Sequence, residues 1–253
     1  MSLGIYFTLG DLGLRASEAI LIAAAQAGAT LLEIGVGFSD PLLDGSTIQA
    51  SHVRALESQL SWEDVCAALV RIRSQIPGTT QISLMLSYQL LYSAERGAKL
   101  PPLDGILLPD ISYRLPSPVL LPSPRVWFLS PDLVFSPTFG AAPETISMVY
   151  LTRLQGITGE SQSAQSSLAQ AIERVKSVTA VPIWLGFGVS TRADLKQAHE
   201  AGATGAIVGS AFVKEIYQTS ENLSSAESEA IRNDKLTKCS KQFVERLLHS
   251  GRD

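Results

Sequence analysis

Eight short apolar runs, separated by stretches with helical periodicity, constrain the fold of this chain more than any other feature. Each run is apolar at successive positions, which is typical of strands that are buried on both faces of a parallel sheet. Strands that alternate with helices indicate βα units, and eight such units predict a closed barrel in preference to an open sheet. The expected strands are Gly4–Leu9, Thr30–Val36, Gln81–Leu86, Asp104–Leu108, Arg125–Leu129, Ile146–Leu151, Val181–Gly186 and Thr204–Val208.

The junctions between helices and strands support this interpretation. AGATLLEIGV at Ala27–Val36 and AGATGAIVGS at Ala201–Ser210 each end a helix at a glycine and then enter a strand. Leu168, Ile172 and Val175 lie four and three residues apart, which places them in one apolar stripe of a helix. We therefore predict an α/β fold of the (β/α)8 TIM-barrel type, for which 253 residues are a usual length.

Two segments depart from the regular alternation. Ile111–Pro124 contains four prolines and no helical periodicity, so we expect the fourth βα unit to be irregular. Thr219–Glu229 is polar and is expected to form the loop before a last helix, not a boundary between domains. We therefore expect residues 1–253 to form a single domain.

Charge and composition exclude several classes of protein. The net charge of −4 argues against a nucleic-acid-binding protein, which would need a surface rich in Lys and Arg. No uncharged apolar run approaches the ~18–20 residues of a membrane span, and the first residues lack the pattern of a signal peptide. Cys66 and Cys239 lie far apart and predict no disulfide framework. These features favour a cytoplasmic protein.

Two carboxylates are the first candidates for chemistry. Glu33 lies within an apolar strand, where a charged and unpaired carboxylate costs several kcal/mol, so it needs a partner or a raised pKa. Asp44 follows eleven residues later, in the loop VGFSDPLLDGS. An acid on a strand and an acid on a loop can face each other across the mouth of a barrel and carry out acid–base chemistry. Alternatively, Glu33 is a buried structural acid and Asp44 is a turn residue or a helix N-cap.

Glycines follow the last two expected strands. Gly188 lies after the seventh strand, and Gly209 and Ser210 lie after the eighth. In many barrels the loops at these positions bind phosphate through backbone N–H groups and the N-terminus of a short helix. The polar loop Leu154–Ser161 after the sixth strand is a candidate lid, and its Gly159 is a candidate for one more N–H donor. Glycines in ordinary turns are the alternative.

The histidines and cysteines predict no metal site, because no cluster of His, Cys and Asp has metal-ligand spacing. His52, His199 and His249 lie in helical patterns beside charged residues, and we expect them at or near the surface. Gly186–Phe187–Gly188 does not extend to GxGxxG, so a dinucleotide site is not expected.

The segment LLEIGVGFSDPLLDGSTIQ resembles the signature of the tryptophan synthase alpha family, roughly LE-x-GVPFSDP-x-ADGPxIQ. Further segments match the family in the same order: Phe7–Gly13, Asp104–Ser112, Gly156–Glu160, Leu185–Ser190 and Gly205–Lys214. The resemblance implies a carbon–carbon lyase of tryptophan biosynthesis, which cleaves indole-3-glycerol phosphate to indole and glyceraldehyde 3-phosphate without a cofactor. It also implies an α2β2 complex, in which indole passes to a beta subunit that carries pyridoxal phosphate.

The resemblance also implies roles for individual residues. Glu33 would be the principal acid–base residue, Asp44 would accept a hydrogen bond from the indole N–H, and Thr158 would hold Asp44. Residues implied to bind phosphate are Gly159, Gly188, Gly209 and Ser210. Residues implied to line the indole pocket are Tyr6, Leu84, Phe128 and Phe187. Asp40 and Pro41 would face the beta subunit.

Several positions depart from the family pattern, and they concentrate near the expected site. Two prolines are replaced in the loop around Asp44, which makes that loop less rigid. The chain also begins almost at its first strand, where relatives have a preceding helix. The departures are Gly37, Leu43, Ser46, Leu86, Leu154 and Gln155. They leave open an alternative to the active lyase: a catalytically weak or inactive regulatory subunit that binds a phosphate ligand and activates the beta subunit. Another phosphate-binding barrel, such as an isomerase of the same pathway, is disfavoured because it would not explain the FSDP…DG…IQ loop.

Overall fold

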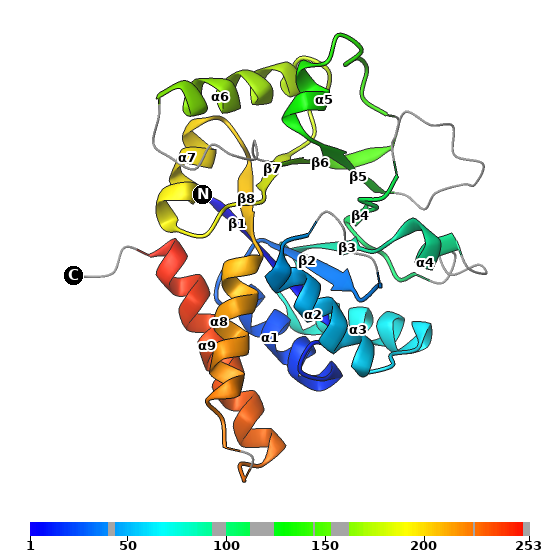
Figure 1. Cartoon of the computed structure of the whole chain (residues 1–253), viewed down its shortest axis with the longest axis vertical. Helices are drawn as coiled ribbons and strands as arrows, with labels where there is room; N and C mark the ends of the chain where they lie inside the picture. The colour runs from blue at the N-terminus through cyan, green and yellow to red at the C-terminus, as the bar shows by residue number, and fades with distance from the viewer. Residues whose placement is uncertain are drawn as a thin grey trace.

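The strands of this protein close into a parallel barrel in which neighbours along the chain are neighbours in space, from β1 round to β8 (Figure 1). The computed structural model describes residues 1–39, 44–92, 100–111, 124–143, 145–152, 162–224 and 226–249. The predicted (β/α)8 fold is confirmed. The strands are β1 (Ser2–Leu9), β2 (Leu31–Val36), β3 (Gln81–Met85), β4 (Gly105–Leu107), β5 (Arg125–Leu129), β6 (Ile146–Thr152), β7 (Ile183–Gly186) and β8 (Gly205–Val208).

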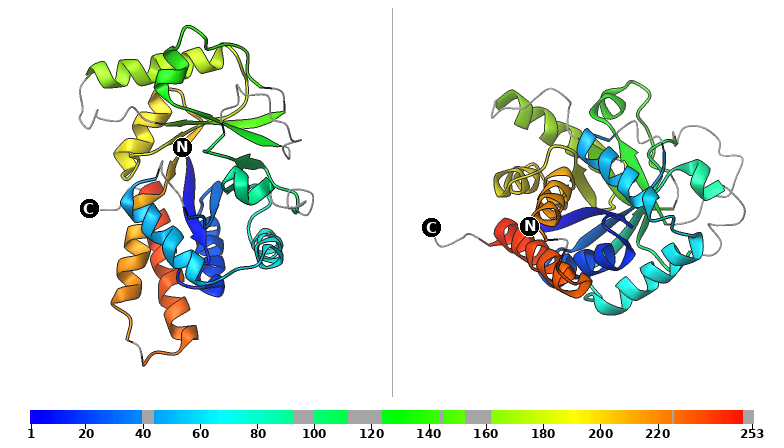
Figure 2. Two further views of the ribbon diagram at one scale, coloured as in Figure 1. Left: turned by 45° about the vertical axis from the view of Figure 1, so that its right-hand side comes forward. Right: turned by 60° about the horizontal axis from the view of Figure 1, so that its bottom comes forward.

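Helices surround the barrel, as the tilted view of Figure 2 shows. The last two described helices, α8 and α9, pack side by side and extend beyond the strands. α9 also packs along α1, and α8 packs on α2 and β1. The helices are α1 (Leu14–Gln26), α2 (Ser46–Glu57), α3 (Trp62–Gln75), α4 (Tyr88–Tyr92), α5 (Pro131–Phe135), α6 (Gln162–Lys176), α7 (Arg192–Glu200), α8 (Ser210–Glu221) and α9 (Glu229–Leu248).

The observed elements follow the sequence pattern closely, with small differences at their ends. β7 begins at Ile183, two residues later than predicted and just after Pro182, which has no N–H to donate to a strand ladder. The segment from Thr219 was expected to be a loop, but α8 continues to Glu221. The Thr219 hydroxyl donates to the carbonyl of Glu215 within this helix, 2.9 Å away. The fourth βα unit, which is expected to be irregular, lies mostly outside the described residues.

The inward side of the barrel combines two large tyrosines with two glycines. Tyr6 of β1 pairs in register with Glu33 of β2. A Cβ atom at Gly35 would collide with the Tyr6 hydroxyl, and one at Gly186 would collide with the ring of Tyr150. The two glycines therefore leave the space that these tyrosine side chains occupy.

Aromatic packing connects the barrel to its outer helices. Phe7 of β1 contacts Phe212 of α8 edge to face, with ring centroids 5.9 Å apart, and Phe212 contacts Phe243 of α9 at 5.1 Å. All three side chains are buried. They fix the position of α8, whose first turn reaches the cavity described next. In the described part of the chain, no helix has both the length and the apolar character to cross a membrane.

Candidate active site

A cavity of about 200 Å³ opens at the carboxyl end of the strands, where active sites of such barrels form. Its walls come from β1 to β6 and β8, from the loop after β7, from the loop before α2, and from the first turn of α8. Expected site residues in its lining are Tyr6, Glu33, Asp44, Phe128, Phe187, Gly188, Gly209 and Ser210.

Glu33 lies at the base of this cavity, in the middle of β2. It pairs in register with Tyr6 on one side and Ser83 on the other, and only 2% of its surface is exposed. Burial raises the pKa of the Glu33 carboxyl from 4.5 to about 8, and the nearby charge of Asp44 adds to the shift. Glu33 therefore holds a proton at neutral pH and can donate it inside the cavity.

Asp44 faces the same cavity from the loop that precedes α2. Burial raises the pKa of its carboxyl from 3.8 to about 6, so it is mostly ionised at pH 7. Asp44 is not the N-cap of α2, because Gly45 occupies that position. Two carboxyl groups with separated pKa values, one protonated and one ionised at neutral pH, are the arrangement that acid–base chemistry requires.

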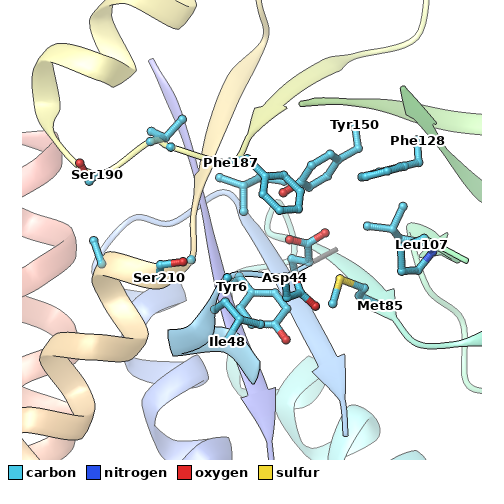
Figure 3. Close-up of a pocket in the computed structure, with 18 residues that line it drawn as sticks. Tyr6, Asp44, Ile48, Met85, Leu107, Phe128, Tyr150, Phe187, Ser190 and Ser210 are labelled. Carbon is cyan, nitrogen blue, oxygen red and sulfur yellow. The ribbon is translucent and has the colours of Figure 1, made fainter. Parts of the chain in front are cut away.

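One end of the cavity is aromatic (Figure 3). The ring of Tyr150 lies 5.5 Å from that of Phe128 and 6.0 Å from that of Phe187, measured between centroids. The Phe128 and Phe187 rings are 6.4 Å apart. These rings can hold a flat apolar ligand group against the two carboxyl groups.

The opposite end of the cavity is suited to an anion. Gly209, Ser210 and Ala211 line it at the start of α8. The N-cap is a glycine without a side-chain bond, and the first turn of α8 holds no acidic residue. The first N–H groups of a helix have no partner within the helix, and they attract negative charge. Gly188, with a φ of 72°, turns the loop after β7 toward the same end.

Known proteins are similar in sequence to this barrel over most of its length. The family model described as "Tryptophan synthase alpha chain" matches residues 2–119 and 139–244. The chain belongs to the tryptophan synthase alpha chain family. The tryptophan synthase alpha chain of Vibrio cholerae is 36% identical over 224 residues, which cover 83% of this chain and 81% of that one. The tryptophan synthase alpha chain of Picosynechococcus is 34% identical and covers 83% of both chains.

Solved structures show the same similarity in three dimensions. A mutant tryptophan synthase alpha-subunit of Pyrococcus furiosus is 28% identical and has a TM-score of 0.72; the match covers 98% of this chain and 97% of that one. A chain of the tryptophan synthase complex of the same organism is 27% identical, has a TM-score of 0.69 and gives the same coverage.

One expected residue of the alpha-chain pocket lies elsewhere, so the prediction for Leu84 is wrong. Leu84 is fully buried but is not part of the cavity lining, whereas its neighbour Met85 is. Side chains alternate across a strand, and Leu84 pairs in register with Ile34, next to Glu33. In β3 it is therefore the side chain of Met85, and not that of Leu84, that points into the cavity.

Two residues near the carboxyl groups were missed or misplaced by sequence reasoning. Tyr150 lines the cavity but is not among the residues expected from the sequence. It lies two residues after Met148 in β6, so the two side chains are on the same face of the strand. His52 was expected near the surface, but it is fully buried. It belongs to the inner face of α2, together with Ile48, Ser51 and Ala55. His199 and His249 are exposed, as expected.

Several positions expected from the alpha family belong to segments outside the described part of the chain. Thr158 and Gly159, with the departures Leu154 and Gln155, lie outside the described residues, and so do Asp40, Pro41 and Leu43. Within the described ranges, no three His, Cys, Asp or Glu residues are grouped in a way that could hold a metal ion.

Proposed function

We propose that this protein is the alpha subunit of a tryptophan synthase and cleaves indole-3-glycerol phosphate to indole and glyceraldehyde 3-phosphate. It would do so in the cytoplasm, as one barrel domain without a cofactor of its own. The observation that carries the proposal is a cavity with an aromatic end, two carboxyl groups of separated pKa and a helix N-terminus opposite. The indole, the cleavable bond and the phosphate fit these three parts in that order.

The proposed reaction uses Glu33 twice. Protonated Glu33 donates its proton to C3 of the indole ring, and the ionised Asp44 accepts a hydrogen bond from the indole N–H, whose nitrogen becomes positively charged. Glu33, now ionised, takes the proton of the adjacent hydroxyl. The bond between C3 and the glycerol carbon breaks, its electron pair returns to the ring, and the aldehyde leaves. Glu33 ends the cycle protonated, so no cofactor is required.

The proposed partner is the beta subunit of tryptophan synthase, which carries the pyridoxal phosphate. Asp40 and Pro41 would form part of the contact, since the family places its subunit interface at this loop. A coupled assay tests the function directly: indole release from indole-3-glycerol phosphate is measured with and without the beta subunit. Cleavage supports the proposal. Activation of the beta subunit without cleavage would instead establish the weak or inactive regulatory subunit.

The pH dependence of kcat/KM is expected to be bell-shaped, with its maximum between about pH 6 and pH 8. Below about pH 6 Asp44 becomes protonated and loses the charge that stabilises the indole nitrogen. Above about pH 8 Glu33 loses the proton that it must donate. Initial rates of indole release from about pH 5 to pH 9.5 measure both limbs. A rate that keeps rising above pH 8 would contradict the assignment of Glu33 as the initial acid.

Replacing Gly209 with leucine is expected to weaken binding of indole-3-glycerol phosphate by roughly 10- to 100-fold, because one or two hydrogen bonds to a charged group are lost. A Cβ atom at Gly209 would lie 3.4 Å from Cβ of Tyr6, an ordinary contact, so Gly209→Ala is the matched control and should bind nearly normally. The larger side chain would fill the space in front of the α8 N–H groups. Calorimetry with the phosphate ester and with indole distinguishes the effects. An equal loss of indole binding would argue against a phosphate site here.

A further inference from the structure

His52 is a buried titratable side chain that the proposed reaction does not use. Its Nδ1 atom lies 3.3 Å from the backbone nitrogen of Phe38, which donates to it. The ring of Phe38 packs against the imidazole edge to face, with centroids 4.7 Å apart. Because Nδ1 accepts a hydrogen bond, the neutral ring must carry its proton on Nε2. Burial lowers the pKa of His52 from 6.5 to about 4, so the ring is neutral at physiological pH.

A chain of buried hydroxyl groups fixes the same tautomer from the other side. Ser51 Oγ donates to the carbonyl of Ile48 at 2.8 Å, so it must accept the 2.7 Å hydrogen bond from Thr8 Oγ1. Thr8 in turn accepts from Tyr6 Oη at 3.1 Å. Tyr6 has then used its only proton, and it accepts from His52 Nε2, also at 3.1 Å. Each hydroxyl carries one proton, so the chain has one direction.

Asp44 is the second acceptor in front of this Nε2–H group. Its Oδ2 atom lies 3.8 Å from Nε2, beyond a hydrogen bond but within reach of one after a small movement of the carboxylate. Catalytic hydrogen bonds are often long in the absence of ligand and shorten in the complex. We propose that His52 is a positioning residue that donates Nε2–H to Asp44 when ligand binds, and so holds that carboxylate ionised and directed into the cavity. The inference rests on the proposed function, since it assigns His52 a role in the same site.

The surroundings of His52 direct its Nε2–H group to Asp44 and to no other carboxylate named here. The imidazole cannot rotate to another partner, because the backbone N–H of Phe38 and the ring of Phe38 hold it. The shift of Nε2–H from Tyr6 to Asp44 exchanges a neutral acceptor for a charged one, which forms the stronger bond. Titratable and charged groups around this point are Tyr6, Asp11, Glu33, Asp44, Arg54 and Tyr150, with Arg54 paired to Asp11.

Two substitutions distinguish the loss of the Nε2–H donor from the loss of the other contacts of the His52 side chain. His52→Asn keeps an oxygen near the position of Nδ1, where it can accept from Phe38, but removes the distal donor. His52→Gln places an amide N–H near the position of Nε2 and is the matched control. The acidic limbs of kcat and of the affinity for indole-3-propanol phosphate, a probe without the glycerol hydroxyls, are measured for both variants, because kcat reports the groups of the complex. Thermal unfolding of each variant is recorded alongside.

We expect His52→Asn to move the acidic limb of kcat to higher pH by about one unit, and to lower kcat/KM at pH 7 roughly tenfold, as expected for a lost hydrogen bond to a charged group. His52→Gln should restore most of the loss. If both variants lose activity equally without moving the limb, or if His52→Asn matches the wild type, the inference is overturned. If the wild type binds the probe but cleaves no indole-3-glycerol phosphate, only the proposed function is overturned. The pH dependence of probe affinity in the two variants would then still test the role of His52.

Discussion

Replacing Glu33 with glutamine is expected to lower the rate of indole-3-glycerol phosphate cleavage by about 10²–10⁴-fold, the usual contribution of a general acid–base group. Glutamine has nearly the same shape, but it can neither donate a proton to the indole ring nor accept one from the hydroxyl. Single-turnover release of indole measures the loss. Turnover near the wild-type value would make Glu33 a structural acid, and the proposed reaction would be wrong.

The stability of the same variant shows whether the fold is intact. The pKa of Glu33 is about 8 in the folded protein and 4.5 as its ordinary value, so the folded state binds this proton more tightly. Its contribution to stability is therefore fully present below about pH 4.5, and is lost as the pH rises through 8. Glutamine never loses a proton, so Glu33→Gln should be more stable than the wild type at about pH 9 and similar to it at about pH 4. Urea unfolding at the two pH values measures the difference.

Replacing Arg54 with methionine is expected to reduce the free energy of unfolding by about 3 kcal/mol, the lower end of the range for breaking a buried ion pair. Arg54 donates to both carboxylate oxygens of Asp11, at 2.6 and 2.8 Å. Asp11 is 1% exposed, and the Arg54 side chain is 21% exposed, which is why the lower end applies. The Arg54 guanidinium also lies 4.1 Å from the ring centre of Tyr217. The pair therefore connects the loop after β1, α2 and α8.

The control for Arg54→Met also removes the negative charge of Asp11, which the single substitution leaves buried without its partner. The double variant Asp11→Asn with Arg54→Met leaves no carboxylate to bury, so it should recover a large part of the lost stability. Urea denaturation of the two variants and the wild type gives the comparison. A loss below about 1 kcal/mol in the single variant would mean that the pair behaves as an exposed surface salt bridge.

The barrel could be predicted from sequence because buried parallel strands leave a strong signal. The strands β1 to β8 lie within about two residues of their expected bounds. Each apolar run is short and is flanked by a glycine or a helical pattern, which leaves few other positions for the ends of the strand. The raised pKa of Glu33 follows from the same logic, because a carboxyl inside an apolar run must be desolvated wherever the strand lies. These features depend on local sequence alone.

Other features depend on which face of an element turns inward, and this is a property of packing. A shift of one residue exchanges Leu84 for Met85 at the cavity, and the apolar sequence of β3 does not distinguish the two. His52 was misplaced because its charged neighbours suggested solvent. The stripe of Ile48, His52 and Ala55, at helical spacing, was the signal that could have placed it inside.

The pairing of β1 with β8 has a consequence for how the protein acquires its binding site. The cavity requires both Tyr6 and Ser210, which lie on elements at opposite ends of the barrel order. A ribosome delivers β8 last, so a nascent chain has neither a closed barrel nor a complete cavity until about residue 210 has emerged. A phosphate ester that contacts both ends binds only the closed form, and so it shifts the refolding equilibrium toward closure by mass action. Ligand binding is therefore a direct reporter of the completed fold.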